Sequence, residues 1–307
     1  MEKILKGEGF QNRYRITGKL KTLSPLHVGT GEEDENRIPK IQRSKRQGKA
    51  ETPVNVSTVI KDARSKPVIP GSALKGVIRH WLLNVLGGVS EEWAATHDDE
   101  IEQLHELGQD EQIAAVKKFS WLELLFGTPF HEGKVEMWDA SCLTPRIPAP
   151  DNLLHWNADL LTYVDTSVAI DPDTGTAKEN LLYKAEIVPP GVEFELNITG
   201  QNLGEEELGL LLFGLQGFNS TIYPIRVGAR GGRGFGRMQF MPGPIYALES
   251  TEAIRKWIKD TMQSLASSPA ATEAGDAGYF ALPELSPERQ AELIAKVKGK
   301  FISALGA

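Results

Sequence analysis

The sequence predicts an α+β protein built on a ferredoxin-like (RRM-like) core, in which strands and helices follow one another in the order β-α-β-β-α-β. Three observations support this fold class. Several short segments alternate apolar and polar residues, as strands do, and two longer segments repeat apolar residues every three or four positions, as helices do. The order of these segments along the 307 residues is that of the fold, with insertions between them.

Four segments have the alternation expected of core strands, and the cleanest is 191–200, with the sequence GVEFELNITG. The others are 12–23, 134–142 and the segment that begins at 234. The first core helix is predicted from Ser72, a favourable N-cap residue, to Leu86. Its apolar residues form one continuous stripe, and Gly87 and Gly88 end it. The second core helix is predicted at 203–215.

We expect one domain at 1–243 with three excursions, and a helical C-terminal extension at 244–307. The excursions are a basic loop at 31–66, an acidic helical insertion at 88–120 and a long hairpin at 163–186. The extension contains a helix at 251–266, a linker rich in Ser, Ala, Pro and Gly, and a helix at 287–305 that Ser286 caps.

The net charge of −7 conceals a polarity along the chain. Residues 1–80 contain 17 Lys and Arg against 8 Asp and Glu, whereas residues 81–132 contain 2 against 11. The first segment can attract a polyanion although the whole protein is acidic. The chain has one cysteine, Cys142, and no apolar run of the ~18 to 20 residues that a membrane-spanning helix needs. We therefore expect a cytoplasmic protein without a membrane partner.

The glycine-rich segment 228–238, GARGGRGFGRM, is the strongest local motif. Its glycines allow close approach of the backbone to a ligand, and Arg230, Arg233 and Arg237 surround Phe235 with positive charge. A phosphate is the expected ligand. The segment fits neither a Walker loop nor a dinucleotide-binding motif, and the alternative is a plain turn with solvated arginines.

Two further basic features suit a polyanion. Ser72, Lys75 and Arg79 fall on one flank at the start of the first helix, whose N-terminus favours anions. The alternative is a capped surface helix with solvated cations. The basic loop contributes a cluster that would bind nucleic acid in a salt-dependent way, or would only be solvated. Its candidate RNA-binding residues are Arg37, Lys40, Arg43, Lys45 and Arg46.

Catalytic candidates are few. The six histidines include no pair at zinc-binding spacing, and no Gly-x-Ser-x-Gly motif occurs. His27 is a candidate general base or RNA contact, although a packing role suits it equally. Asp34, in a run of four acidic residues, is a candidate catalytic residue and Mg²⁺ ligand, and such runs are more often solvated.

Three motifs in this order resemble the RAMP superfamily of CRISPR-associated proteins. They are Pro25-Leu26-His27-Val28-Gly29, the helix start Ile69-Pro70-Gly71-Ser72-Ala73-Leu74-Lys75-Gly76, and the glycine-rich segment 228–238. Further matches are Leu125-Phe126-Gly127, the segment GKVEMWDA at 133–140, and 168–186, which resembles the projecting thumb hairpin of that superfamily.

Within the superfamily, the pattern is most similar to the backbone subunits of type III effector complexes. The resemblance implies a palm that grips guide crRNA, a thumb that wedges into the guide-target duplex, and other CRISPR effector subunits stacked along the RNA. It also implies that Lys75, Arg79, Arg230, Arg233 and Arg237 meet phosphates, and that the 31–66 loop lies near target RNA. Phe235 could stack on a base.

One departure from the family concerns catalysis. Members that cleave target RNA carry an aspartate before the helix start, and Val56 occupies that position here. A valine cannot bind a metal ion, so this subunit binds RNA without cutting it, or Asp34 substitutes and the chain is a Mg²⁺-dependent endoribonuclease. Binding itself requires no cofactor. A cytoplasmic enzyme that binds a small phosphorylated metabolite is the alternative of another class.

Overall fold

The computed structural model describes residues 3–34, 56–97, 103–147, 156–170, 177–267 and 282–306. Its main sheet contains four antiparallel strands in the order β10-β1-β9-β5. These are β10 (Met238–Leu248), β1 (Arg13–Thr22), β9 (Glu193–Gln201) and β5 (Val135–Met137). In chain order the core strands are β1, β5, β9 and β10, so the spatial order is 4-1-3-2, which confirms the ferredoxin-like fold.

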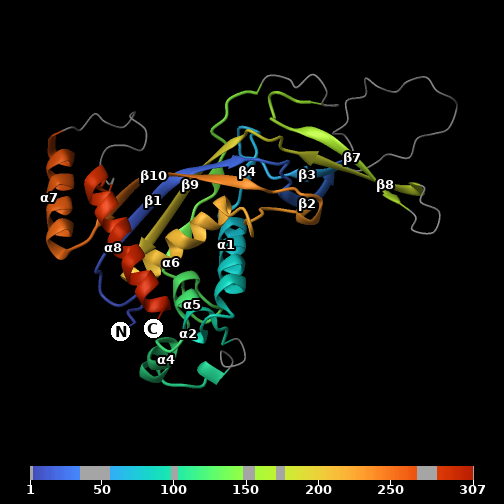
Figure 1. Ribbon diagram of the computed structural model, residues 1–307. Coiled ribbons are helices and arrows are strands. Elements are labelled where there is room, and N and C mark those ends of the chain that lie inside the picture. Colours follow the sequence, from blue (N-terminus) through green and yellow to red (C-terminus); the bar gives the residue numbers. More distant parts are fainter. Residues whose placement is uncertain are drawn as a thin grey trace.

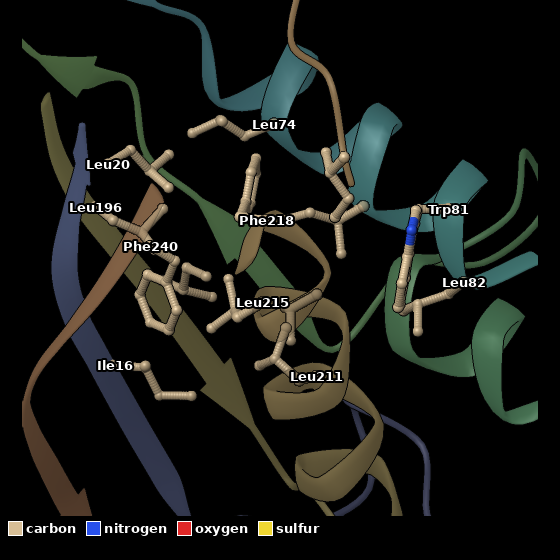
Figure 2. Packing of buried hydrophobic residues seen from close by; sticks show 14 of the residues in the cluster. Ile16, Leu20, Leu74, Trp81, Leu82, Leu196, Leu211, Leu215, Phe218 and Phe240 are labelled. Atoms are coloured by element: carbon tan, nitrogen blue, oxygen red, sulfur yellow. The ribbon is translucent and has the colours of Figure 1, made fainter. Parts of the chain in front are cut away.

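Helices α1 (Gly71–Leu86) and α6 (Glu205–Gln216) cover one face of this sheet (Figure 1). The apolar stripe predicted for α1 is largely buried, and it packs with inward side chains of β1, β9 and β10 (Figure 2). Leu20, Leu74, Leu82 and Leu215 are fully buried in this layer. Burial of each such side chain stabilises the fold by about 1.5–3 kcal/mol. The packing fixes the position of α1 and α6 on the main sheet, and these three parts together are here named the palm.

The start of α1 differs from the prediction in its cap. The N-cap residue is Pro70, and Ser72 is an exposed residue of the first turn rather than the cap. Asp139 supplies the missing acceptor, because its Oδ1 receives a hydrogen bond of 2.8 Å from the Gly71 amide. The short sheet of β4 (Val68–Ile69) and β6 (Ala140–Ser141) holds these two segments together. Pro70 precedes the helix without a side-chain donor or acceptor, so the cap had to come from elsewhere.

A second sheet projects beside the palm and has the order β2-β3-β8-β7 (Figure 1). It contains β2 (Gly29–Asp34), β3 (Val56–Val59), β8 (Ala177–Ile187) and β7 (Tyr163–Ile170). The 163–186 segment is thus an antiparallel hairpin of β7 and β8, and β3 pairs with β8 in parallel. The expected loop at 31–66 is not a loop at its ends, because β2 and β3 pair with each other there.

The acidic insertion contains helices α2 (Glu91–Ala94) and α4 (Gln109–Val116), and α5 (Trp121–Phe126) follows it. Ser120 caps α5 in a capping box with Glu123. The insertion is only partly solvated, since Leu104, Val116 and Phe119 form a small buried cluster with Leu124.

The C-terminal extension is not separate from the palm. Strand β10 continues to Leu248, past the expected boundary at 243, so the boundary falls inside a core strand. Helix α7 (Thr251–Ser267) follows, and α8 (Pro287–Leu305) packs against α6 with Leu293, Val297 and Phe301 buried. Ser286 caps α8 as expected. The amphipathic face of α8 therefore completes the core. No described helix is long and apolar enough to cross a membrane.

Candidate functional site

The motifs singled out in the sequence meet at one end of the main sheet, here named the loop end. Register pairs Thr22, the last residue of β1, with Met238, the first residue of β10. The segment 25–29 leaves β1 at this end, and the glycine-rich segment enters β10 there. Helix α1 also starts toward this end, because β4, directly before it, pairs with β6, and Cys142, the residue after β6, bridges to Phe194, which pairs with Leu20. Residues distant in sequence are thus brought together by strand order.

The glycine-rich segment is a tight loop closed by an isolated bridge between Arg226 and Arg237. The Val227 amide donates to the Gly236 carbonyl at 2.9 Å, and a short 3-10 helix (Gly231–Arg233) forms the tip. Gly236 has φ +78°, and a Cβ there would be 2.1 Å from the Val227 carbonyl oxygen. Gly236 is therefore required by backbone conformation and by packing.

The arginines of this loop divide into two groups. Arg233 and Arg237 are exposed, as is Arg226, which the sequence interpretation missed because it precedes the glycines. Arg230 is instead engaged: its Nη1 lies 3.1 Å from Asp165 Oδ2 on β7, and its guanidinium lies 6.0 Å from the Phe235 ring centre. Arg230 thus ties the loop to the second sheet. Arg226 Nη1 donates to the Gly231 carbonyl at 2.7 Å and so braces the loop, while Arg233 and Arg237 are exposed to an anion.

His27 joins the loop end to the second sheet. Its imidazole is buried, with Nδ1 donating to the Glu186 carbonyl at 2.7 Å and Nε2 lying 3.3 Å from Ser57 Oγ. Its own carbonyl accepts the Ala229 amide at 2.9 Å. Burial lowers the pKa of His27, and the nearby Arg230 lowers it further. This environment is that of a neutral packing histidine, so the general-base role expected for His27 lacks an accessible imidazole.

Lys75 and Arg79 of α1 lie near the β5 edge of the sheet, because Lys75 interacts electrostatically with Arg79 and with Glu136 of β5. Both cations are partly buried. Burial lowers the pKa of Lys75, and the neighbouring cations Lys6 and Arg79 lower it further. The carboxylates of Glu132 and Glu136 act in the opposite direction and raise it. Lys6 holds those carboxylates at 2.5 and 2.8 Å. Ser72, Lys75 and Arg79 lie on one flank of α1, as their spacing predicts, but Ser72 is exposed whereas the two cations are partly buried. Lys75 also lies within the electrostatic influence of Lys6, Glu132 and Glu136.

The catalytic candidate Asp34 is placed by the backbone register of β2 and β3. Asp34 of β2 is paired with Val56 of β3, the position at which the resemblance implies an aspartate in a cleaving subunit. The Val56 side chain is fully buried. Among the described residues no three His, Cys, Asp or Glu side chains are grouped to hold a metal ion. Val56 and its described neighbours thus do not by themselves form a Mg²⁺ site.

The basic loop residues fall at positions the structure does not describe. Arg37, Lys40, Arg43, Lys45 and Arg46 lie within 35–55, outside the described residues.

A cavity of about 250 Å³ lies elsewhere, at the opposite end of the sheet from the glycine-rich loop. Tyr14, Glu249 and Arg289 line its polar side, and Leu208 and Leu293 its apolar side. The Tyr14 hydroxyl donates to Glu249, which also binds Arg289. No residue of the glycine-rich loop lines this cavity, so it is not a phosphate pocket of that loop.

Comparison with known proteins agrees with this arrangement of motifs. The model of the RAMP superfamily matches residues 19–239, from the middle of β1 into the start of β10, and so spans the palm, the second sheet and the glycine-rich loop. A search of curated proteins finds no match. Because the matched segment is more than half of the sequence and contains all three motifs, the chain belongs to the RAMP superfamily.

Proposed function

We propose that this chain is a guide-crRNA-binding structural subunit of a type III CRISPR ribonucleoprotein, that it helps hold the guide-target duplex in antiviral defence, and that it acts in the cytoplasm. The observation that carries the proposal is the glycine-rich loop, which presents Arg233 and Arg237 to solvent at the loop end. Exposed arginines on a rigid loop bind phosphates without reading sequence, which suits a subunit that must accept any guide.

The second sheet supports a role beside the loop. The β7-β8 hairpin projects from the palm in Figure 1, and Arg230 and His27 connect its base to the glycine-rich loop. A hairpin that is attached to the glycine-rich loop stays at a constant distance from the RNA backbone that the loop binds. This geometry suits a thumb that contacts the guide-target duplex at a set position.

The test is co-purification of the protein with guide RNA. The unsubstituted protein should absorb more at 260 than at 280 nm, and Arg233→Glu with Arg237→Glu should abolish the excess. Lys256→Glu with Lys259→Glu is the matched control, because it makes the same charge change on the exposed side of α7. Equal RNA content in the two double variants would contradict the proposal.

A second candidate function is cleavage of target RNA, favoured by the pairing of Asp34 with Val56. In this version the carboxylate missing at Val56 is supplied from the adjacent strand, and a Mg²⁺ ion would activate the attacking group. Asp34→Ala should then stop cleavage of a complementary target and leave guide binding intact. Continued cleavage by a variant lacking Asp34 and the adjacent acids would assign this chain a binding role alone.

Other effector subunits are the proposed partners of the acidic insertion. Glu91, Glu92, Asp110 and Glu111 are exposed there, and such a face repels RNA. Charge reversal at these four residues should weaken assembly of the complex without changing guide content. Unchanged assembly would leave this face a solvated surface.

A further inference from the structure

The outer face of the main sheet, opposite α1 and α6, has a distinct composition. Side chains alternate along β1, so that Tyr14, Ile16 and Leu20 enter the core. The intervening positions face outward and include four cations, Arg13, Arg15, Lys19 and Lys21. Since successive outward residues are about 6.7 Å apart, the central strand carries a row of positive charge roughly 27 Å long. Lys21 lies next to the loop end, and Arg13 lies at the far end.

Two aromatic rings flank this row. The Arg15 guanidinium lies 5.7 Å from the Trp138 ring centre and 5.6 Å from that of Tyr246. Register places Tyr246 of β10 opposite Arg15, and the Trp138 amide bonds the Asn197 carbonyl beside β9. Arg15 Nε also donates to Asn197 Oδ1 at 3.0 Å. Tyr246, Arg15 and Trp138 therefore form one row across the four strands.

The exposure of Trp138 has no structural explanation. Half of its surface, 50%, is in contact with solvent, whereas Trp81, Trp93 and Trp121 are buried and Trp156 and Trp257 are partly buried. An exposed indole with a cation against one ring face leaves the other ring face for stacking.

Two of the carboxylates on this face are already paired with lysines, and Glu284 lies exposed at the β10 edge, where it forms an isolated bridge with Tyr246. Glu136 is occupied by Lys6, which comes from outside the sheet. Glu193 pairs with Lys19 at 3.1 Å, in an exposed contact that contributes little and gives way to a phosphate. Glu195 is the remaining acid of the outward β9 positions, against three further cations on β1.

We propose that the outer face of the main sheet is a second RNA-binding surface, which takes a single-stranded segment. Bases stack on Trp138 and Tyr246, and the cations of β1 contact the phosphates. Aromatic rings on a sheet with flanking positive charge are the usual means of binding single strands, because every base has a stacking face. This site goes beyond the guide-binding loop and does not depend on it.

The experiment uses a background that lacks the first site. A fluorescein-labelled 12-residue oligouridine is titrated with the Arg233→Glu/Arg237→Glu protein at low salt, and anisotropy gives Kd. Adding Trp138→Ala should raise Kd about tenfold, and Trp138→Phe should restore most of the affinity. Tyr223→Ala is the matched control: Tyr223 is 48% exposed and packs beside Trp81 on the helical side. Circular dichroism checks that each variant is folded.

Three results of the titration would overturn the proposal: no binding of oligouridine to the background protein, the same Kd with and without Trp138, or an equal effect of Tyr223→Ala. A protein subunit that is retained only when Trp138 is intact, with no effect on oligouridine, would assign the face to protein docking and also overturn it. Guide co-purification should not change in Trp138→Ala alone, so failure here is distinguishable from failure of the guide-binding proposal.

Discussion

Gly228 lies so close to His27 that a Cβ at position 228 would be 2.3 Å from the His27 carbonyl oxygen. The backbone there has φ +78°, and the next amide, Ala229, donates to that same carbonyl. The contact seats the start of the glycine-rich loop on the segment that leaves β1. The direction of the exposed arginines thus depends on one position that only glycine can occupy.

Gly228→Ala should therefore weaken guide binding by about tenfold while leaving the palm folded, because the loop must move to admit the methyl group. Gly232→Ala is the matched control, since a Cβ at the loop tip meets nothing within 4 Å. Anisotropy with labelled guide RNA measures both variants. Equal affinities of the two variants would show that the contact of Gly228 with the His27 carbonyl does not orient the loop.

His27 should make stability depend on pH. Burial lowers the pKa of His27 in the folded state below the ordinary value that it has in the unfolded chain. As pH falls, the unfolded chain therefore binds a proton that the folded protein does not. The stability present above the unfolded-state pKa is lost as pH falls through the folded-state pKa. We expect the free energy of unfolding to decrease between pH 7.5 and 5.5. Burial also lowers the pKa of His131, which adds to the decrease.

His27→Gln keeps a hydrogen-bond donor but does not titrate, so urea unfolding of this variant should show a smaller decrease over the same pH interval. His80→Gln, on the exposed side of α1, is the control and should follow the unsubstituted protein. A His27→Gln variant with the full decrease would assign the pH dependence to His131 and to carboxylates.

Salt dependence should report the number of phosphate contacts made by the loop. Each contact to a single strand contributes about 0.7 to the slope of log K against log salt. Arg233→Gln with Arg237→Gln removes two contacts and should lower the slope by about 1.4. Titrations of guide RNA at salt concentrations from about 50 to about 300 mM measure this slope. A weaker affinity at every salt concentration with an unchanged slope would mean that these arginines act indirectly.

The buried pair of Lys134 and Glu207 should be a stability determinant. Both side chains are 1% exposed and their charged atoms lie 2.6 Å apart. Glu207 also accepts the Gly204 amide at the start of α6. Lys134→Met alone should cost about 3–5 kcal/mol, because an uncompensated carboxylate stays buried. Adding Glu207→Gln should recover much of the loss, since the amide oxygen can still cap α6. Urea denaturation measures the free energy of unfolding of each variant. An equal loss in Lys134→Met alone and in Lys134→Met with Glu207→Gln would contradict this account.

Much of the palm could be predicted because its elements have strong local signals. The stripe of α1 and the alternation of β9 depend only on residues a few positions apart, and both segments formed as expected. The second sheet could not be predicted in the same way. Its parallel pairing of Val56 with Lys184 joins segments far apart in sequence, and neither segment alone specifies a partner.

The cap of α1 is a similar case. Ser72 is a good capping residue by type, but Asp139 performs that role from the segment between β5 and β6. Residue type gives the tendency, and the position of a neighbour decides whether it is used.

The sequence by itself determined the order of strands and helices, the family motifs and the presence of a cationic glycine-rich loop, because periodicity and backbone freedom are properties of neighbouring residues. Only the tertiary structure decided which cations are free. It left Arg233 and Arg237 exposed, tied Arg230 to Asp165, and placed Lys75 near the β5 edge. A charge becomes available for binding only when no remote segment packs against it, and that depends on how the strands are ordered in space.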